Sequence, residues 1–104
     1  MRIVFDQGTP APLRHALTAH SVATAFELGW SSLANGDLLR EAEARFDLLI
    51  TTDQNLRYQQ NLAGRRLAIL VLPTTSWPEI KGHEAEIVAA ASTLQAGEYR
   101  ELQW

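Results

Sequence analysis

Four acidic residues of this sequence have the type and spacing that suit metal chemistry. Asp6 and Asp53 each come at the end of an apolar run. Glu27 follows a short segment of strand type, and Asp37 precedes a segment of helical composition. Clustered carboxylates raise one another's pKa unless a cation joins them. Mg²⁺ and Mn²⁺ prefer such oxygen ligands, and these ions promote phosphodiester hydrolysis.

The elements that must position these acids alternate between strand and helix. The patterns predict strands at residues 2–5, 21–24, 46–51 and 67–72, helices at 10–17, 38–45, 54–62 and 77–94, and an edge strand in the tail at 98–104. Leu48, Leu49 and Ile50 form an unbroken apolar run in the third strand, and the fourth strand is apolar throughout, which is typical of strands buried on both faces. The alternation predicts one α/β domain over residues 1–104, with a mostly parallel sheet of four or five strands and helices on both faces.

Such a sheet would gather the acids at one edge, because ligands bind beyond the carboxyl ends of parallel strands. Asp6 and Asp53 converge there if the first and third strands are neighbours. We expect Glu27 and Asp37 on or near the same rim. Structural roles stay open for each acid: Asp53 can cap a helix, Asp37 can close a turn, and Glu27 can be a solvated loop residue. Asp6 ends an apolar strand, where a buried acid is energetically unfavourable unless it is capped, and this favours a functional role.

Polar residues beside Asp53 are candidates for supporting roles. The hydroxyls of Thr51 and Thr52 can support the metal ligands, although packing at a strand end explains them equally well. Asn55 and Arg57 can orient a phosphate or the attacking water, and the alternative is a solvated helix face. The three tryptophans are spread along the chain and predict no stacking platform for bases.

Composition limits the classes of function. The 104 residues carry a formal net charge of −3, which argues against nucleic-acid binding by charge alone. A metal ion would supply local positive charge. The sequence has no cysteine, so disulfides and thiolate metal sites are excluded. No apolar run reaches the ~20 residues of a membrane span, and Asp6 comes too early for a signal peptide. We therefore expect a soluble cytoplasmic protein without membrane association.

Four runs carry a resemblance to a known family: Ile3-Val4-Phe5-Asp6-Gln7-Gly8, Glu27-Leu28-Gly29, Gly36-Asp37-Leu38-Leu39 and Leu49-Ile50-Thr51-Thr52-Asp53-Gln54-Asn55-Leu56. Over residues 1–72 the sequence resembles the compact PIN-like proteins of bacterial toxin–antitoxin modules, which are related to a C-terminal ribonuclease domain. The resemblance implies a PIN-like three-layer α/β/α sandwich. It also implies an endoribonuclease toxin that hydrolyses single-stranded RNA with Mg²⁺ or Mn²⁺.

The resemblance assigns the catalytic and metal-binding roles to Asp6, Glu27, Asp37 and Asp53. It further implies an antitoxin partner and a homodimer. Two departures from the family favour an alternative, a PIN-like interaction module that has lost catalysis. The chain is shorter than a standard PIN domain, and Asn55 stands where close relatives often carry another acid.

A third hypothesis is a phospho-accepting receiver domain. Receivers are also doubly wound and also have an acid after the first strand and an acceptor aspartate near position 53. Two details argue against this hypothesis. Asp6 has no acidic neighbour, and the single lysine, Lys81, lies within a predicted helix and not at the end of a late strand.

Overall fold

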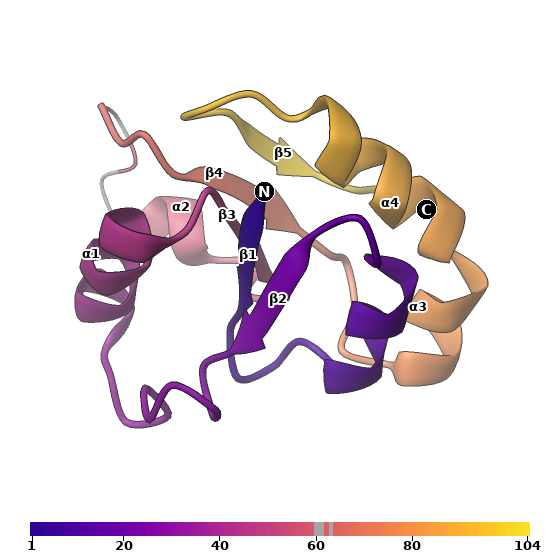
Figure 1. The fold of residues 1–104 in the computed structure, drawn as a ribbon, viewed down its shortest axis with the longest axis horizontal. Coiled ribbons are helices and arrows are strands. Elements are labelled where there is room, and N and C mark those ends of the chain that lie inside the picture. The colour runs from indigo at the N-terminus through magenta and orange to yellow at the C-terminus, as the bar shows by residue number, and fades with distance from the viewer. Residues whose placement is uncertain (60–61, 63) are drawn as a thin grey trace.

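Five parallel strands form the centre of the protein, in a computed structural model that describes residues 1–59, 62 and 64–104 (Figure 1). The strands are β1 (Arg2–Phe5), β2 (Ser21–Thr24), β3 (Leu48–Thr51), β4 (Ala68–Val71) and β5 (Tyr99–Glu101). Their order in the sheet is β2-β1-β3-β4-β5, and each neighbouring pair is parallel. The first and third strands are therefore neighbours, as the convergence of Asp6 and Asp53 requires.

Helices cover both faces of this sheet (Figure 1). They are the 3₁₀ helix η1 (Ala11–Ala16) and the α-helices α1 (Asn35–Arg45), α2 (Leu56–Gln59), α3 (Trp77–Gly82) and α4 (Glu84–Thr93). Residues of α1 and α2 pack on one face, and residues of η1, α3 and α4 pack on the other. The predicted three-layer α/β arrangement is confirmed. None of the helices in the described part of the chain is long and apolar enough to cross a membrane.

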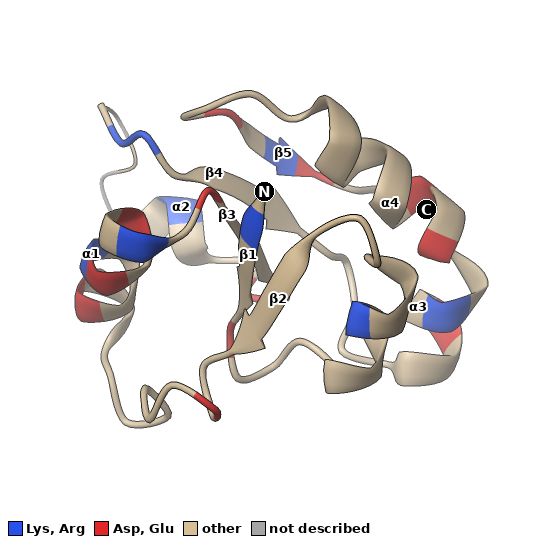
Figure 2. Ribbon diagram, viewed as in Figure 1, with Lys and Arg blue, Asp and Glu red and all other residues tan. Residues whose placement is uncertain are grey.

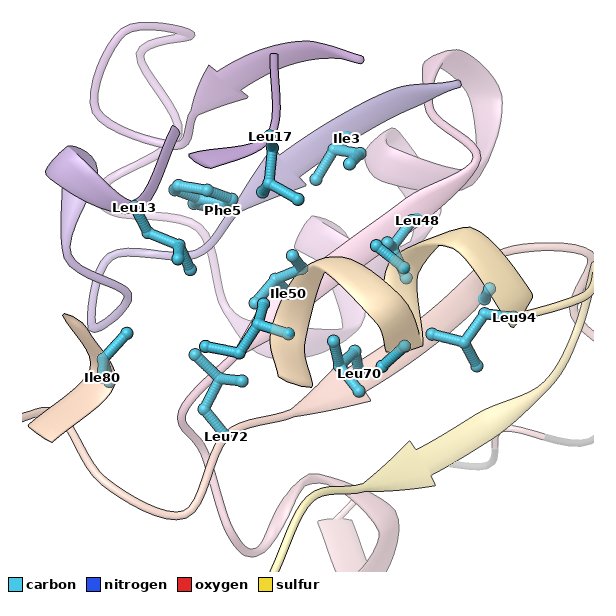
Figure 3. Packing of buried hydrophobic residues seen from close by; sticks show 14 residues of the cluster. Ile3, Phe5, Leu13, Leu17, Leu48, Ile50, Leu70, Leu72, Ile80 and Leu94 are labelled. Carbon is cyan, nitrogen blue, oxygen red and sulfur yellow. The ribbon is translucent and has the colours of Figure 1, made fainter. Parts of the chain in front are cut away.

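Two apolar layers hold the sandwich together. Alternate residues of the strands point to opposite faces. Figure 3 shows the first layer, in which Ile3, Phe5, Ile50 and Leu70 meet side chains from η1, α3 and α4. The second layer contains Val4, Leu49, Ile69 and Val71 with Leu39 of α1 and Leu56 of α2. This double burial explains the apolar runs at residues 3–5, 48–50 and 68–71 of the three central strands, since each fully buried large side chain contributes roughly 1.5–3 kcal/mol.

The first two strands begin and end at the predicted residues, whereas the next two are shorter than predicted. β3 begins at Leu48, two residues later than predicted. The Phe46 N–H donates to the Ala42 carbonyl at 2.7 Å, which ends α1, and the Asp47 carboxylate accepts from the Arg2 N–H at 2.8 Å. The segment at residues 10–17 forms a 3₁₀ helix. Of the predicted helix at 54–62, α2 covers Leu56–Gln59, and residues 60 and 61 lie outside the described residues.

The prediction of one long helix at residues 77–94 is wrong, because the chain breaks at His83. Its backbone angles are φ −118° and ψ 21°, and its N–H donates to the Ile80 carbonyl at 2.9 Å. The indole of Trp104 stacks on the His83 ring at 4.3 Å between centroids, and its Nε1–H donates to Glu79 at 3.1 Å. The residue that stabilises the break is thus 21 positions away, so helical periodicity alone cannot reveal the break.

Candidate metal centre

Asp6 and Asp53 come together at the carboxyl ends of β1 and β3. Phe5 pairs with Ile50 in the ladder, and the Asp6 N–H continues this ladder by donating to the Ile50 carbonyl at 3.3 Å. The chain leaves β1 toward β2 on one side, and β3 lies on the other side. The two acids therefore flank the point where the strand order reverses, where doubly wound sheets bind their ligands.

The hydroxyl of Thr51 connects the two acids. Thr51 is 1% exposed. Its Oγ1 donates to Asp6 Oδ2 and accepts from the Asp53 N–H at 3.0 Å. On the other oxygen of Asp6, Thr9 Oγ1 lies 2.7 Å from Oδ1 and 3.0 Å from the Ile50 carbonyl oxygen. Thr51 thus contacts both predicted acids, and a second hydroxyl, that of Thr9, contacts Asp6 and was not predicted.

The Asp6 carboxyl resists ionisation. Burial raises its pKa above the ordinary value of 3.8. The hydrogen bonds from Thr51 and Thr9 lower the pKa, and the nearby charge of Asp53 raises it again, so that the net shift is upward. A cation placed between the two carboxylates would offset both the burial and the repulsion.

The carboxylate of Asp53 is held from two directions. Its Oδ1 accepts from the backbone N–H of Asn55 at 2.9 Å, and its Oδ2 accepts from Asn35 Nδ2 at 3.1 Å. Asn55 contributes through its backbone, and its side chain is exposed. Asn35 lies at the start of α1 and was not among the predicted site residues. This contact could not be predicted from the sequence, because Asn35 and Asp53 are 18 positions apart.

Gly8 and Thr52 bring the loop after β1 against the end of β3. A Cβ at position 8 would lie 2.5 Å from Thr52 Oγ1. The loop can approach this closely because residue 8 is glycine. Thr52 therefore packs against the loop that carries Asp6, which is the structural alternative to its predicted supporting role.

Glu27 is engaged by a different partner. The guanidinium of Arg14, in η1, donates hydrogen bonds to both carboxylate oxygens of Glu27, with 3.1 Å between Nη1 and Oε2. The Thr24 N–H also donates to Oε1, at 2.9 Å. The Arg14 hydrogen bond, followed by that from Thr24, lowers the pKa of Glu27 to about 2. Glu27 thus holds the turn after β2 against η1.

Asp37 and Arg57 also lie in contacts of their own. Asp37, in the first turn of α1, accepts from Arg40 Nη2 at 2.6 Å, and its side chain is 52% exposed. Arg57 lies 3.5 Å from Glu101 of β5 and over the ring of Tyr58. Among the residues that the structure describes, no three acidic or histidine side chains form a group that could hold a metal ion. The expected convergence of four acids is thus reduced to the pair of Asp6 and Asp53, since Arg14 and Arg40 engage the other two.

The pair still suits one hard cation. Its donors are carboxylate oxygens, and Mg²⁺ is commonly bound by one or two carboxylates while it keeps several waters. Each of the four oxygens accepts one of the hydrogen bonds described above and so retains a lone pair. Hydroxyl and amide donors around a ligand oxygen orient it, as surrounding groups do in metal sites.

A cleft of about 730 Å³ adjoins the pair on the side of Asp6. Its walls come from the loop after β1, from η1, from the turn after β2 and from the start of α3. Asp6, Arg14, Phe26, Glu27 and Trp77 all line it. The volume lies in the range of small-molecule and nucleotide sites.

Charge is otherwise mixed over the surface. Figure 2 shows basic and acidic residues interspersed on α1, α3 and β5. Comparison with models of protein families, with curated proteins and with solved structures finds no match to this chain.

Proposed function

We propose that this protein is a Mg²⁺- or Mn²⁺-dependent endoribonuclease whose cation is bound by Asp6 and Asp53. The observation that carries the proposal is the carboxylate pair at the switch point of the sheet, joined by the Thr51 hydroxyl. The raised pKa of Asp6 supports it, because carboxyl groups with perturbed pKa values cluster at functional sites.

The chain's own residues would act by binding and positioning. Asp6 and Asp53 would hold the cation, and a bound Mg²⁺ or Mn²⁺ would supply Lewis acidity for phosphodiester hydrolysis. Thr51 fixes the spacing of the two carboxylates, since one hydroxyl contacts the side chain of Asp6 and the backbone of Asp53. Thr9 and Asn35 fix the remaining carboxylate oxygens of the pair.

The resemblance to PIN-like proteins extends this proposal. On this resemblance, the substrate is single-stranded RNA and the protein is the toxin of a toxin–antitoxin pair that acts in the cytoplasm. The protein is then bound by an antitoxin and able to dimerise. The mixed surface charge supports a substrate held mainly at the metal, because a protein that tracks the RNA backbone by charge needs a basic groove.

The second candidate function is that of a PIN-like interaction module that has lost catalysis. Its support is that Glu27 and Asp37 are engaged by arginines, which leaves two carboxylates for the cation. A receiver is less well supported. The strand order is one that receivers share, but Lys81 is exposed in the last turn of α3 and does not directly follow a strand.

The test combines metal binding and cleavage. Isothermal titration should show Mn²⁺ binding, and a 5′-labelled single-stranded RNA should be cut in Mn²⁺ but not in EDTA. Asp6→Asn and Asp53→Asn should abolish both activities. Asp47→Asn is the matched control, since Asp47 stands at the opposite end of β3 and bonds the Arg2 N–H.

Cleavage that survives in either variant, or in EDTA, would disprove the assignment. Mn²⁺ binding without cleavage by the unmodified protein would select the inactive module.

A further inference from the structure

The cleft beside Asp6 has aromatic side chains on walls that come from different parts of the chain. Phe26 follows β2, and Trp77 begins α3. Phe26 is 77% exposed, which is unusual for a large apolar side chain, and it gains no packing from the protein core. The separation of these residues in the sequence explains why no stacking platform was predicted.

The charges of the cleft argue against a phosphate inside it. Arg14 is the single cation among the described residues that line the cleft, and Glu27 neutralises it through contacts to both carboxylate oxygens. Glu27 and Asp6 are acids. The part of a ligand that enters here should therefore be uncharged, flat and apolar on its faces, with polar edges. A nucleobase has this chemistry, and bases stack on aromatic side chains.

The position of the cleft connects this ligand to the proposed metal centre. Asp6 forms one wall of the cleft and also contacts Asp53 through Thr51. A nucleotide whose phosphate lies at the carboxylate pair therefore has its base at the mouth of the cleft. A base in a duplex is stacked and paired, so the cleft accepts only an unpaired base.

We propose that the cleft between Phe26 and Trp77 binds an unpaired nucleobase of the RNA strand next to the phosphate at Asp6 and Asp53. This inference rests on the proposed ribonuclease function, and it adds to it the group that selects single strands. It also gives the protein a source of RNA affinity that does not depend on a basic surface.

The first experiment measures a base-dependent affinity with probes that contain no phosphodiester to cut. Adenosine 5′-monophosphate and ribose 5-phosphate are titrated in Mn²⁺ by calorimetry. The unmodified protein should bind the nucleotide at least about tenfold more tightly, as expected for stacking of one base. Phe26→Ala should bring the two affinities within about twofold of each other, and Phe26→Tyr should preserve the difference.

Tyr58→Ala is the matched control, because Tyr58 is an exposed aromatic residue, at 72%, outside the cleft. It should leave the ratio of the two affinities unchanged. Phe26→Ala is preferred to Trp77→Ala, since Trp77 also packs against the core and its removal would disturb the fold.

The second experiment connects the base site to the strand. Phe26→Ala should raise the KM for single-stranded RNA about tenfold with little change in kcat, and adenosine 5′-monophosphate should inhibit cleavage competitively. An unchanged KM would mean that the cleft does not hold the strand and would overturn the inference.

The two proposals fail in different ways. The base site would be overturned, even if RNA is cut, by equal affinities of the unmodified protein for the two probes. It would also be overturned if Phe26→Ala leaves the ratio of the two affinities unchanged. A ratio that depends on Phe26 in a protein that cuts no RNA would support the base site and overturn the ribonuclease function.

Discussion

Replacing Asp6 with asparagine keeps the shape of the side chain and removes its charge. The Thr51 hydroxyl can still donate to the remaining oxygen. The new amide nitrogen would face Thr9 Oγ1, which can accept it when its own proton points to the Ile50 carbonyl. No polar group loses its partner, so the change isolates the effect of the charge.

Metal-free Asp6→Asn should therefore be more stable than the unmodified protein near pH 8. Removal of one unfavourable functional charge contributes about 1 kcal/mol, within the ~0.5–2 kcal/mol of a typical stabilising substitution. For a domain of this size, that free energy corresponds to a rise of roughly 4–8 °C in Tm.

The sign of the pH dependence follows from the raised pKa of Asp6 in the folded state. A carboxyl whose folded pKa exceeds its unfolded pKa favours the folded state at low pH, and this contribution is lost as pH rises through the folded pKa. The advantage of the asparagine variant should thus shrink as the pH falls from 8 toward the raised pKa of Asp6, where the unmodified protein begins to take up a proton on this carboxyl.

Addition of Mn²⁺ should reverse the order. A ligand at a hundred times its Kd stabilises the folded state by about 2.7 kcal/mol, which exceeds the gain of the variant. Thermal unfolding followed by circular dichroism, at pH 4 and pH 8 with EDTA or Mn²⁺, measures all four conditions. The reasoning about burial would be refuted if the asparagine variant is less stable than the unmodified protein in EDTA at pH 8. It would also be refuted if the difference in Tm between the two proteins is the same at pH 4 and pH 8. An order unchanged by Mn²⁺ would refute the metal site.

Three further substitutions, one of them with a matched control, test separate features. Gly8→Ala should lower the unfolding free energy by about 1–3 kcal/mol in urea melts, because its Cβ would meet Thr52 Oγ1 at 2.5 Å. Gly82→Ala, in open space on a helix, should not lower it. Asp37→Asn should leave the Mn²⁺ affinity, measured by calorimetry, within about twofold of that of the unmodified protein. A loss of more than about tenfold would show that Asp37 contributes to the metal site. Leu70→Ala, in a fully buried position, should cost about 2–5 kcal/mol in the same melts, and a smaller loss would contradict the packing of the first layer.

The strands and the carboxylate pair were predictable because their signals are local. The apolar runs of β1 and β3 identify strands buried on both faces, and the parallel arrangement follows from their alternation with helices. Asp6 and Asp53 then fall at one edge of the sheet by topology alone.

The partners of the acids were not predictable, because they depend on side chains that folding brings from elsewhere. Glu27 was assigned to the metal by its place after β2, but Arg14 engages it from η1. Asn35 reaches Asp53 across 18 positions of sequence, and Thr9 reaches the Ile50 carbonyl across 41. Pattern and propensity report how a segment folds and carry no information on which distant side chain meets it.

The placement of charge at the strand ends also bears on how the sheet finds its register. Where one face of a strand is polar, a slip of one residue exposes apolar side chains and is rejected. β1 and β3 are apolar on both faces, so a slip would merely exchange one apolar layer for the other. The carboxylates prevent it. A slip of about 3.3 Å toward the start of β1 would draw Asp6 into the apolar interior, and a slip toward the end of β3 would draw in Asp47, and a carboxylate without a partner is strongly unfavourable there. The acid proposed to bind the metal therefore also selects the alignment of the strand that carries it.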